Sequence, residues 1–245
     1  MSLIGQTVTV IGAGVAGLAV ARALALRGAK VTVLEQADAI REVGAGLQIS
    51  PNGAAVLRAL GLQGALETAS TRAEAVQLVD GPTGEPVTRL DLARLRPGQG
   101  YHFLHRADLI ALLLQGATEA GVTLRNIVAV EERAKWAEES WTLRDDPMDL
   151  RLAFEGFAPR VQGWLERVED PWLWGLFRHP VAATWTRTLP QGAVAILGDA
   201  AHPTLPFLAQ GASMALEDAW VLAESLASHD TAAAALAAYQ AARKP

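Results

Sequence analysis

The sequence predicts an α/β fold built around a parallel sheet, and three observations support this prediction. Thr7–Ile11 is a short β-branched run that ends at a glycine, and an Ala- and Leu-rich helix is expected over Val15–Leu26. Lys30–Leu34 is a second apolar strand, so the three segments form a β-α-β unit with a right-handed crossover. Hydrophobic residues make up 51% of the 245 residues, enough for a substantial core.

Helices and strands are expected along the rest of the chain. Ser50 to about Leu60 is predicted to be a helix, and the turn "GPTGE" is predicted to join two strands at Ala75–Asp80 and Pro86–Leu92. The parallel-sheet pattern is expected to resume in the apolar run Ala193–Leu197. The remaining expected elements are strands near Val122–Leu124 and Ile127–Val130, and helices over Ala107–Ala120, Pro147–Phe154, Pro159–Val168, Ala212–Ala227 and Thr231–Ala242.

The composition excludes several kinds of partner and chemistry. The formal net charge is −5, from 21 basic and 26 acidic residues without a Lys/Arg cluster, so nucleic acid and anionic membranes are not expected partners. The chain has no cysteine, which excludes a disulfide framework, a thiolate zinc site and a cysteine nucleophile, and which fits a cytoplasmic protein. Glycines and Arg22 interrupt the apolar run Val8–Leu26, so a strand, turn and helix explain it better than a signal peptide or membrane span.

The turn after the first strand matches the pattern G-x-G-x-x-G, in Gly12-Ala13-Gly14-Val15-Ala16-Gly17. In a dinucleotide-binding unit the first glycine makes a tight turn, the second lets the backbone approach a pyrophosphate, and the third lets the helix pack on the strand. The helix N-terminus then offers N–H groups and a positive dipole to the phosphates. Glu35 ends the next strand, where a carboxylate can accept both hydroxyl hydrogens of a ribose without a 2′-phosphate, as in NAD or FAD.

The stretch "GDAAHPTLPFLAQGA", which follows the apolar run near the end of the chain, favours FAD over NAD. FAD is the longer cofactor and must be held at both ends. Asp199 can accept hydrogen bonds from ribityl hydroxyls, and the helix that begins near Gly211 and Ala212 can direct its amides at the flavin pyrimidine edge. Prolines, Pro206 among them, stiffen the loop between these two groups. A plain NAD dehydrogenase would leave this stretch unexplained.

Together these motifs resemble the class A flavoprotein aromatic hydroxylases, the salicylate and para-hydroxybenzoate hydroxylase group. The resemblance rests on "VIGAGVAGLAVARAL…VTVLEQ", "REVGAGLQISPNG", "HRADL" and "GDAAHPTLPFLAQGASMALEDA", which cover both ends of the chain. It implies a Rossmann-like FAD-binding domain of the glutathione-reductase type, with a small tryptophan-rich helical segment. It also implies cofactor contacts at Gly12, Gly14, Val15, Ala16, Gly17, Glu35, Gln36, Arg41, Gly46, Leu47, Arg106, Asp199, Pro206, Gly211, Ala212 and Ser213.

The resemblance also implies an activity. In that family NADH or NADPH reduces the flavin, O2 adds at flavin C4a, and the resulting hydroperoxide hydroxylates an aromatic ring. The expected cofactors and partners are therefore FAD, NADH or NADPH, O2 and an aromatic small molecule. Within the cofactor set, Arg41 is expected near the pyrophosphate, Gly46 and Leu47 along the flavin, and Arg106 in contact with FAD.

The chain departs from the resembled family in its middle. Family members carry a second fingerprint, "GADG", and a mixed sheet that roofs the substrate pocket, whereas this sequence passes from "NIVAVEE" directly to "RAKWAEESWT". The FAD-binding domain, 1–245, is therefore divided into an N-terminal part at 1–130, a tryptophan-rich helical connector at 131–190 and a C-terminal part at 191–245. Without the roof, hydroxylation is expected to be uncoupled or impaired, with NADH consumed and H2O2 released. The alternative is an FAD-binding module, or minimal flavin scaffold, without hydroxylase activity.

Two groups of histidines are candidates for direct roles in chemistry. His202 is a candidate acid or base near the flavin, and Pro206 is a second candidate for a position beside the flavin. The favoured interpretation of His202 is a loop histidine satisfied by the backbone, because the chemistry belongs to the cofactor. His102 and His105 are three residues apart but have no third ligand cluster beside them, so no metal site is expected.

Two further groups are expected to be structural. Glu217 and Asp218 are expected to be solvated or helix-capping acids. Because their partner sheet is missing, tryptophans of the connector are expected to be exposed, repacked or buried in a homodimer contact. These tryptophans are Trp136, Trp141, Trp164, Trp172, Trp174 and Trp185.

Overall fold

The computed structural model describes residues 3–37, 46–95, 97–126, 144, 146–171, 179–205 and 210–244. Contacts divide the chain into two compact units. The first unit contains Met1–Arg72, Gln99–Glu131 and Arg178–Pro245, and the second contains Ala73–Gly98 and Glu132–Phe177. The contacts thus group residues 73–98 with the middle of the chain, and the three-part division at 130 and 190 stays a prediction.

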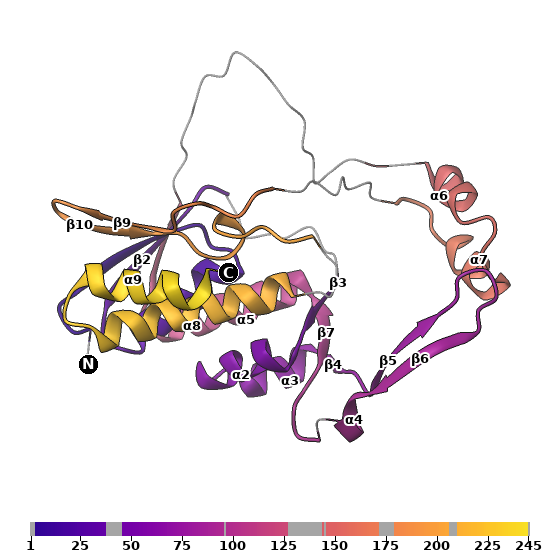
Figure 1. The fold of residues 1–245 in the computed structure, drawn as a ribbon, viewed down its shortest axis with the longest axis horizontal. Coiled ribbons are helices and arrows are strands. Elements are labelled where there is room, and N and C mark those ends of the chain that lie inside the picture. The colour runs from indigo at the N-terminus through magenta and orange to yellow at the C-terminus, as the bar shows by residue number, and fades with distance from the viewer. Residues whose placement is uncertain are drawn as a thin grey trace, which may run out of the picture. The chain divides into compact units, whose positions relative to one another are not determined.

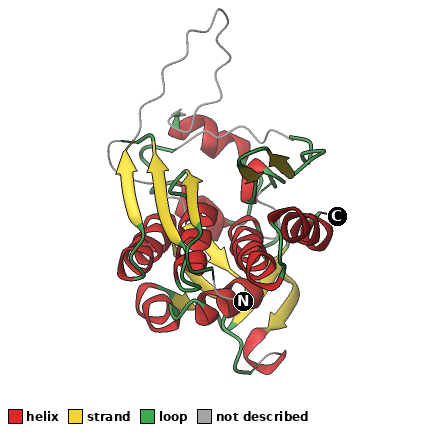
Figure 2. Cartoon of the chain, turned by 90° about the vertical axis from the view of Figure 1, so that its left-hand side faces the viewer, coloured by secondary structure: helices red, strands yellow, loops and turns green. Residues whose placement is uncertain are grey.

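The centre of the first unit is the predicted β-α-β unit. β1 (Thr7–Ile11) pairs in parallel with β2 (Lys30–Glu35), and β2 pairs in parallel with β8 (Thr123–Asn126). The three strands point the same way in Figure 2. α1 (Val15–Ala25) connects β1 to β2, and most of its residues are buried because nearly all are small or apolar. The parallel α/β fold is therefore confirmed.

Helices from distant parts of the chain pack around α1. α8 (Gly211–Ser228) contacts α1, α2 (Pro51–Ala59) and α9 (Ala232–Arg243), and α5 (Arg106–Glu119) also contacts α1. Figure 1 shows α8 and α9 side by side. The helices predicted in these four regions are confirmed, and together with α1 they enclose the core. Fully buried core side chains include Leu18, Leu57, Leu109, Leu113, Leu216 and Tyr239.

One charged residue, Arg22, ties these helices together from inside. Arg22 lies in α1 and is only 9% exposed. Its Nε donates to the carbonyl oxygen of Leu60 at 2.8 Å, and its Nη1 donates to the carbonyl oxygen of Gly116. Both carbonyls lie near helix C-termini, and the carbonyl of Gly116 also accepts from the backbone N–H of Ala120 at 3.1 Å. The guanidinium therefore holds the ends of α2 and α5 against α1.

The same unit contains a second, antiparallel sheet that the sequence pattern did not predict. It has the order β3-β7-β4 and consists of β3 (Gly46–Ile49), β7 (His102–His105) and β4 (Thr71–Arg72). α2 follows β3 directly, with Pro51 in its first turn, and α3 (Gln63–Ala69) precedes β4. Four-residue strands give only two alternations of polarity, which is too short a pattern to detect.

The interpretation of Ala193–Leu197 as a return of the parallel sheet is wrong. β10 (Gly192–Ala195) pairs antiparallel with β9 (Thr186–Leu189), and within the described ranges it joins no other strand. Gly192, with φ of 151°, stands at the turn between them. β9, the neighbouring strand along the chain, thus provides the backbone hydrogen bonds that β10 would otherwise make to a parallel strand.

The second unit is small and mostly exposed. β5 (Ala75–Val79) pairs antiparallel with β6 (Pro86–Asp91), as predicted, and the short α4 (Leu92–Leu95) follows. α6 (Pro147–Ala153) and α7 (Pro159–Leu165) occur where short helices were predicted. Across both units, no helix in the described residues is long and apolar enough to cross a membrane.

Candidate functional site

The three glycines of the turn between β1 and α1 meet different surroundings. Gly12 has φ of 96°, a left-handed conformation that glycine adopts at low cost. A Cβ atom on Gly17 would lie 2.0 Å from the carbonyl oxygen of Gly12, so a side chain at Gly17 would push α1 away. A Cβ atom on Gly14 would meet no atom within 4 Å. Internal packing therefore explains Gly17, whereas the space beside Gly14 is open to a ligand.

The N-terminus of α1 leaves its first amides uncapped. Gly14 is the N-cap residue, no side chain caps the helix, and no acidic residue lies in its first turn. The first N–H groups of a helix have no intrahelical acceptor and carry the positive end of the helix dipole. This end of α1 can therefore bind an anion such as a pyrophosphate.

Glu35 ends β2 and its side chain reaches back to the glycine turn. Its Oε2 accepts a hydrogen bond from the backbone N–H of Ala13 at 2.6 Å, and its Oε1 accepts from that of Ala37 at 2.9 Å. Partial burial raises the pKa of Glu35, but backbone N–H donors at Ala13, Ala37 and Gln36 lower it by more, so the pKa lies below its ordinary value. An ionised carboxylate is thus fixed beside the turn.

The short 3-10 helix η1 (Gly198–Ala200) brings the second motif to the first. Gly198 has φ of 60°, and a Cβ atom on it would lie 3.0 Å from the Cβ of Ala16 and 3.5 Å from that of Ala215. The loop therefore contacts the first turn of α1 on one side and α8 on the other. Asp199 follows with an exposed side chain that has no hydrogen bond or ion pair within the described part of the chain.

α8 begins within one residue of the predicted position and presents a second uncapped helix N-terminus. No side chain caps it and its first turn contains no acid. A Cβ atom on Gly211 would lie 3.1 Å from Oγ1 of Thr204. Thr204 follows the Gly198 loop in the chain, so this segment lies against the N-terminus of α8. Ser213 is fully buried, and its Oγ lies 2.9 Å from Oγ of Ser50. The Ser213 hydroxyl therefore joins α8 to the start of α2.

The pairing of β3 with β7 gathers three more of the predicted cofactor residues. Gly46 pairs with His105 and Leu47 pairs with Leu104, and Arg106 follows as the first residue of α5. A cleft of about 450 Å³ opens beside this sheet. It is lined by Gly46, Leu47, Gln48, Ala69, Thr71, Phe103, Leu104, His105 and Asp108.

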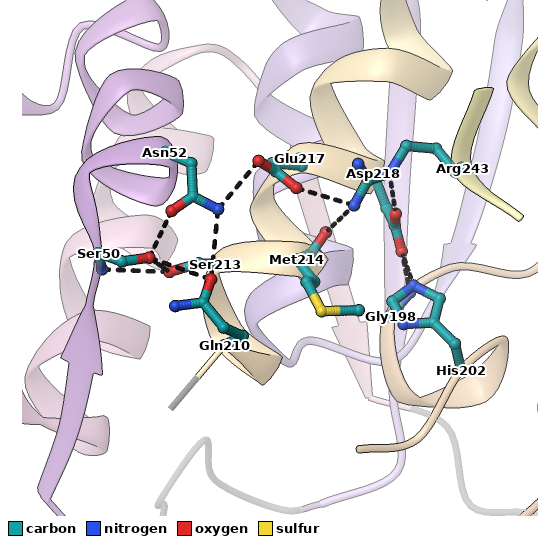
Figure 3. A network of polar contacts seen from close by, with 10 residues as sticks. All are labelled: Ser50, Asn52, Gly198, His202, Gln210, Ser213, Met214, Glu217, Asp218 and Arg243. Atoms are coloured by element: carbon teal, nitrogen blue, oxygen red, sulfur yellow. Dashed lines mark hydrogen bonds and ion pairs between the residues drawn. The ribbon is translucent and has the colours of Figure 1, made fainter. Parts of the chain in front are cut away.

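A buried polar network lies behind the Gly198 loop, as Figure 3 shows. Asp218 of α8 is fully buried, and its Oδ2 accepts from the backbone N–H of Gly198 at 2.9 Å and lies 2.5 Å from Nε2 of His202. The other oxygen, Oδ1, accepts from Nε of Arg243 at 2.6 Å. Arg243 also pairs with Oε2 of Glu217 at 2.9 Å. Three segments that are distant in sequence thus meet at one carboxylate.

The expectation that Asp218 is a solvated or capping acid is wrong. An ionised side chain in a helix usually faces solvent, but here three donors compensate its burial. Helical spacing could have shown its position, because Asp218 lies three residues after Ala215 and four before Leu222, and both of these are buried apolar residues. Glu217 is half-buried, and its Oε1 accepts from Nδ2 of Asn52 at 2.9 Å.

His202 is a core residue with an unusual environment. Its ring stacks on Trp185, with centroids 4.9 Å apart and planes inclined by 21°, and both side chains are buried. Its Nε2 contacts the Asp218 carboxylate, so the interpretation that the backbone satisfies this side chain is wrong. The other nitrogen, Nδ1, is buried and has no hydrogen-bond partner among the described residues. Among the described residues, the contacts of this ring are the stacking on Trp185 and the bond to Asp218, which are structural contacts of the core.

The remaining sequence-based candidates have separate outcomes. His102 is buried and His105 exposed on opposite faces of β7, so the two cannot bind one ion together. Trp185 is part of the core, whereas Trp164 is 56% exposed with Arg160 over its ring at 5.0 Å. The candidates that lie outside the described residues are Arg41, Pro206, Trp136, Trp141, Trp172, Trp174 and the strand expected at Ile127–Val130.

The geometry fits an adenine dinucleotide cofactor. Open space beside Gly14, an uncapped helix end and a fixed carboxylate at Glu35 occur together at the carboxyl ends of parallel strands. Such an edge is where doubly wound sheets bind dinucleotides. Asp199 and the N-terminus of α8 offer a second set of polar groups next to this edge. The fold and site therefore define a Rossmann-like dinucleotide-binding protein.

Comparison with known proteins identifies the family. The family model described as "FAD binding domain" matches residues 6–140 and 175–245. Two 3-amino-4-hydroxybenzoate 2-monooxygenases of Streptomyces platensis are 29% and 30% identical over 320 aligned positions, which cover 91% of this chain and 80% of each relative. The chain therefore belongs to the FAD-binding family of class A aromatic hydroxylases.

Other similar proteins agree with this family. The 3-hydroxybenzoate 6-hydroxylase of Klebsiella oxytoca is 26% identical over 332 positions, with 96% of this chain and 84% of the relative covered. The crystal structure of Klebsiella pneumoniae HpxO complexed with FAD and uric acid matches with a TM-score of 0.72 at 22% identity, over 97% of this chain and 84% of that chain. This structural likeness shows the same fold.

The alignments also reveal an internal difference in length. They run over 320 positions, whereas the whole chain has 245 residues, so at least 75 aligned positions of the Streptomyces relatives have no counterpart here. This difference agrees with the prediction that the chain lacks a segment that its relatives have.

Proposed function

We propose that this chain holds FAD between the N-termini of α1 and α8 and acts as an NAD(P)H-dependent monooxygenase on hydroxylated benzoates. The single observation that carries the proposal is the contact at Gly198, where a Cβ atom would touch Ala16 of α1 and Ala215 of α8. It joins the dinucleotide turn to the second motif, so one extended cofactor can reach both. The substrate class is taken from the names of the relatives, which act on hydroxylated benzoates.

The adenosine and pyrophosphate would lie at the glycine turn. The amides of Val15 and Ala16 would face the pyrophosphate, and the open space beside Gly14 would let it approach the backbone. Glu35, with Gln36 beside it, would accept hydrogen bonds from the ribose hydroxyls. The depressed pKa of Glu35 keeps the carboxylate ready to accept at neutral pH.

The flavin half would lie against the second motif and the β3–β7 pair. Asp199 would accept from ribityl hydroxyls, and the amides of Gly211 and Ala212 would stabilise negative charge at the pyrimidine edge. Gly46, Leu47, Arg106 and Pro206 would flank the same region, whereas Arg41 would lie near the pyrophosphate. Ser213 would contribute from its backbone while its hydroxyl bonds to Ser50.

Bound FAD would supply the redox chemistry by passing two electrons from NADH or NADPH to O2. In the coupled reaction, one oxygen atom enters the aromatic ring and the other leaves as water. In the uncoupled reaction, NAD(P)H, a proton and O2 give NAD(P)+ and H2O2. The task of the protein is to position the substrate and exclude water, which favours the coupled route.

The shortened middle favours uncoupling in this chain. Relatives have at least 75 aligned positions without a counterpart in its 245 residues, and a substrate roof is expected in that segment. The same observation favours a second candidate function, an FAD-binding module without hydroxylation.

We also propose a cytoplasmic location, from the lack of cysteine. A homodimer through the tryptophan-rich segment is a further proposal, and sedimentation of the pure protein would test it.

Aerobic turnover distinguishes the two candidates. The FAD-loaded protein is mixed with NADH or NADPH, with and without 3-hydroxybenzoate or 3-amino-4-hydroxybenzoate, and NAD(P)H loss, H2O2 and hydroxylated product are all measured. We expect NAD(P)H oxidation with H2O2 as the main product. Hydroxylated product equal to the NAD(P)H consumed would contradict uncoupling, and no oxidation above that of free FAD would support the module.

A further inference from the structure

We propose that Asp218 is a positioning residue that holds Asp199 in place for the cofactor, although Asp218 itself is too deeply buried to touch a ligand. The inference rests on the proposed function, because it assumes that Asp199 contacts FAD. It assigns a role to a carboxylate that the cofactor motifs leave unexplained. Nothing in the cofactor arrangement above requires an acid at the centre of α8.

The hydrogen bonds of Asp218 clamp the segment that carries Asp199. Its Oδ2 accepts from the N–H of Gly198, one residue before Asp199, and contacts Nε2 of His202, three residues after it. The backbone N–H of His202 also donates to the carbonyl oxygen of Gly198 at 3.0 Å, which closes the turn. Both ends of the turn are therefore fixed to one oxygen atom, and the Asp199 side chain projects from between them.

The clamp is rigid because each partner is itself held. The ring of His202 stacks on the ring of Trp185, and its Nε2 contacts Asp218 at the ring edge. The backbone N–H of Trp185 in turn donates to Oε1 of Gln240 at 2.8 Å. Because Nδ1 of His202 has no partner in the described residues, Nε2 is the only ring atom that fixes this side chain by hydrogen bonding. Loss of the Asp218 contact would therefore release the side chain of His202 and the N–H of Gly198 on either side of Asp199.

Arg243 supplies the compensating charge. Burial by itself lowers the pKa of Arg243, but its hydrogen bond to Asp218 and the charges of Asp218 and Glu217 raise it overall. The guanidinium therefore stays charged beside the buried carboxylate. α9 thus closes the network from the outside, through a residue 18% exposed.

The alternative is that the network only stabilises the fold. A structural role would lower thermal stability without a specific link to Asp199. A positioning role makes the effects of Asp218 and Asp199 on FAD binding depend on each other, because each substitution removes the same contact. The two roles are separated by a double-mutant cycle that measures FAD affinity rather than stability.

The cycle uses Asp199→Asn, Asp218→Asn and the double variant, each folded as apo-protein and titrated with FAD by flavin fluorescence. We expect each single variant to bind FAD about tenfold more weakly, and the double variant also about tenfold, instead of about hundredfold. The visible circular dichroism of bound flavin is expected to change alike in all three. Factors that multiply to about hundredfold would overturn the proposal.

The matched control is Glu217→Gln, the neighbouring carboxylate on α8, which bonds the same Arg243 but neither Gly198 nor His202. Combined with Asp199→Asn, it is expected to give the product of the two separate factors. Coupling as strong as that of Asp218 would mean that disturbance of the network in general, and not the clamp, is responsible, and this would also overturn the proposal.

A second pair of variants applies if Asp218→Asn does not fold. His202→Gln keeps an amide donor near the position of Nε2, whereas His202→Leu removes the donor and keeps an apolar side chain against Trp185. We expect Gln to retain FAD affinity within about threefold and Leu to lose at least about tenfold. Equal affinities of the two variants would overturn the proposal. Wild type that fails to bind FAD would instead refute the proposed function itself.

Discussion

Gly198 and Ala16 lie in contact although they come from opposite ends of the sequence, and a Cβ atom on Gly198 would stand 3.0 Å from that of Ala16. The contact fixes the loop of Asp199 against the first turn of α1. Because Gly198 also has φ of 60°, it combines a left-handed backbone with a close approach, and glycine meets both demands. The fold itself therefore holds the glycine turn of α1 and the loop of Asp199 together, without the cofactor.

The two glycines of the dinucleotide turn should separate binding from stability. Gly14→Ala places a methyl group where no atom lies within 4 Å, so we expect an unchanged melting temperature and FAD affinity at least about tenfold weaker. Gly17→Ala forces a methyl group to within 2.0 Å of the Gly12 carbonyl, so we expect the apo-protein itself to be destabilised. Thermal unfolding of both apo-proteins and FAD titration check this. Equal stability losses would contradict the assignment of Gly14 to the ligand.

Removal of the charge at Glu35 should weaken cofactor binding more than folding. Glu35→Gln keeps an oxygen for the N–H of Ala13 but loses the ionised acceptor for a ribose, so we expect FAD to bind about tenfold more weakly. The competing ligand ADP should lose affinity by the same factor, because only the adenosine end is affected. FAD and ADP titrations of one preparation measure this. A loss with FAD and none with ADP would contradict the ribose role.

Arg22 should be among the most important residues for stability outside the site. Arg22→Met keeps the length of the side chain but removes its donors to the carbonyls of Leu60 and Gly116, so we expect a loss of about 3 kcal/mol in the free energy of unfolding. The control is Arg58→Met, whose guanidinium bonds the exposed side chain of Gln63 and should change stability by less than about 0.5 kcal/mol. Urea unfolding measures both. Similar losses would show that the buried bonds contribute little.

His102 should make the stability of the chain sensitive to acid. Burial lowers the pKa of His102 below its ordinary value of 6.5, the charge of Arg72 lowers it further, and Glu67 opposes both. The unfolded chain then binds the proton first, so stability is complete above about pH 6.5 and declines as the pH falls toward the folded pKa. We expect His102→Asn to remove this part of the decline. Urea midpoints at several pH values compare the slopes, and identical slopes in both proteins would refute the prediction.

Sequence reasoning was most successful where a long periodic pattern or a glycine motif was present. β1, α1, β2, α5 and both C-terminal helices occur where predicted, because their apolar periodicity extends over several turns or ends at a glycine. The Gly12 turn and Glu35 lie together as the β-α-β unit requires. The antiparallel sheet β3-β7-β4 was missed because its strands are two to four residues long.

The buried network was missed for a different reason. Asp218 and Arg243 are charged, and charged residues are placed at the surface unless a partner is known. Their pairing joins α8 to α9 and depends on tertiary packing, which no local pattern encodes. The antiparallel pairing of β10 likewise depends on which neighbour is nearest in space.

The most direct test of the account is the visible absorption spectrum of the freshly purified protein, followed by identification of the cofactor released on denaturation. The account predicts an oxidised-flavin spectrum, or its appearance after addition of FAD, with FAD as the released compound. That result would mean that the turn at Gly14 and the loop at Asp199 hold the cofactor without the middle segment of the relatives. A colourless protein that takes up no added FAD would contradict the central claim.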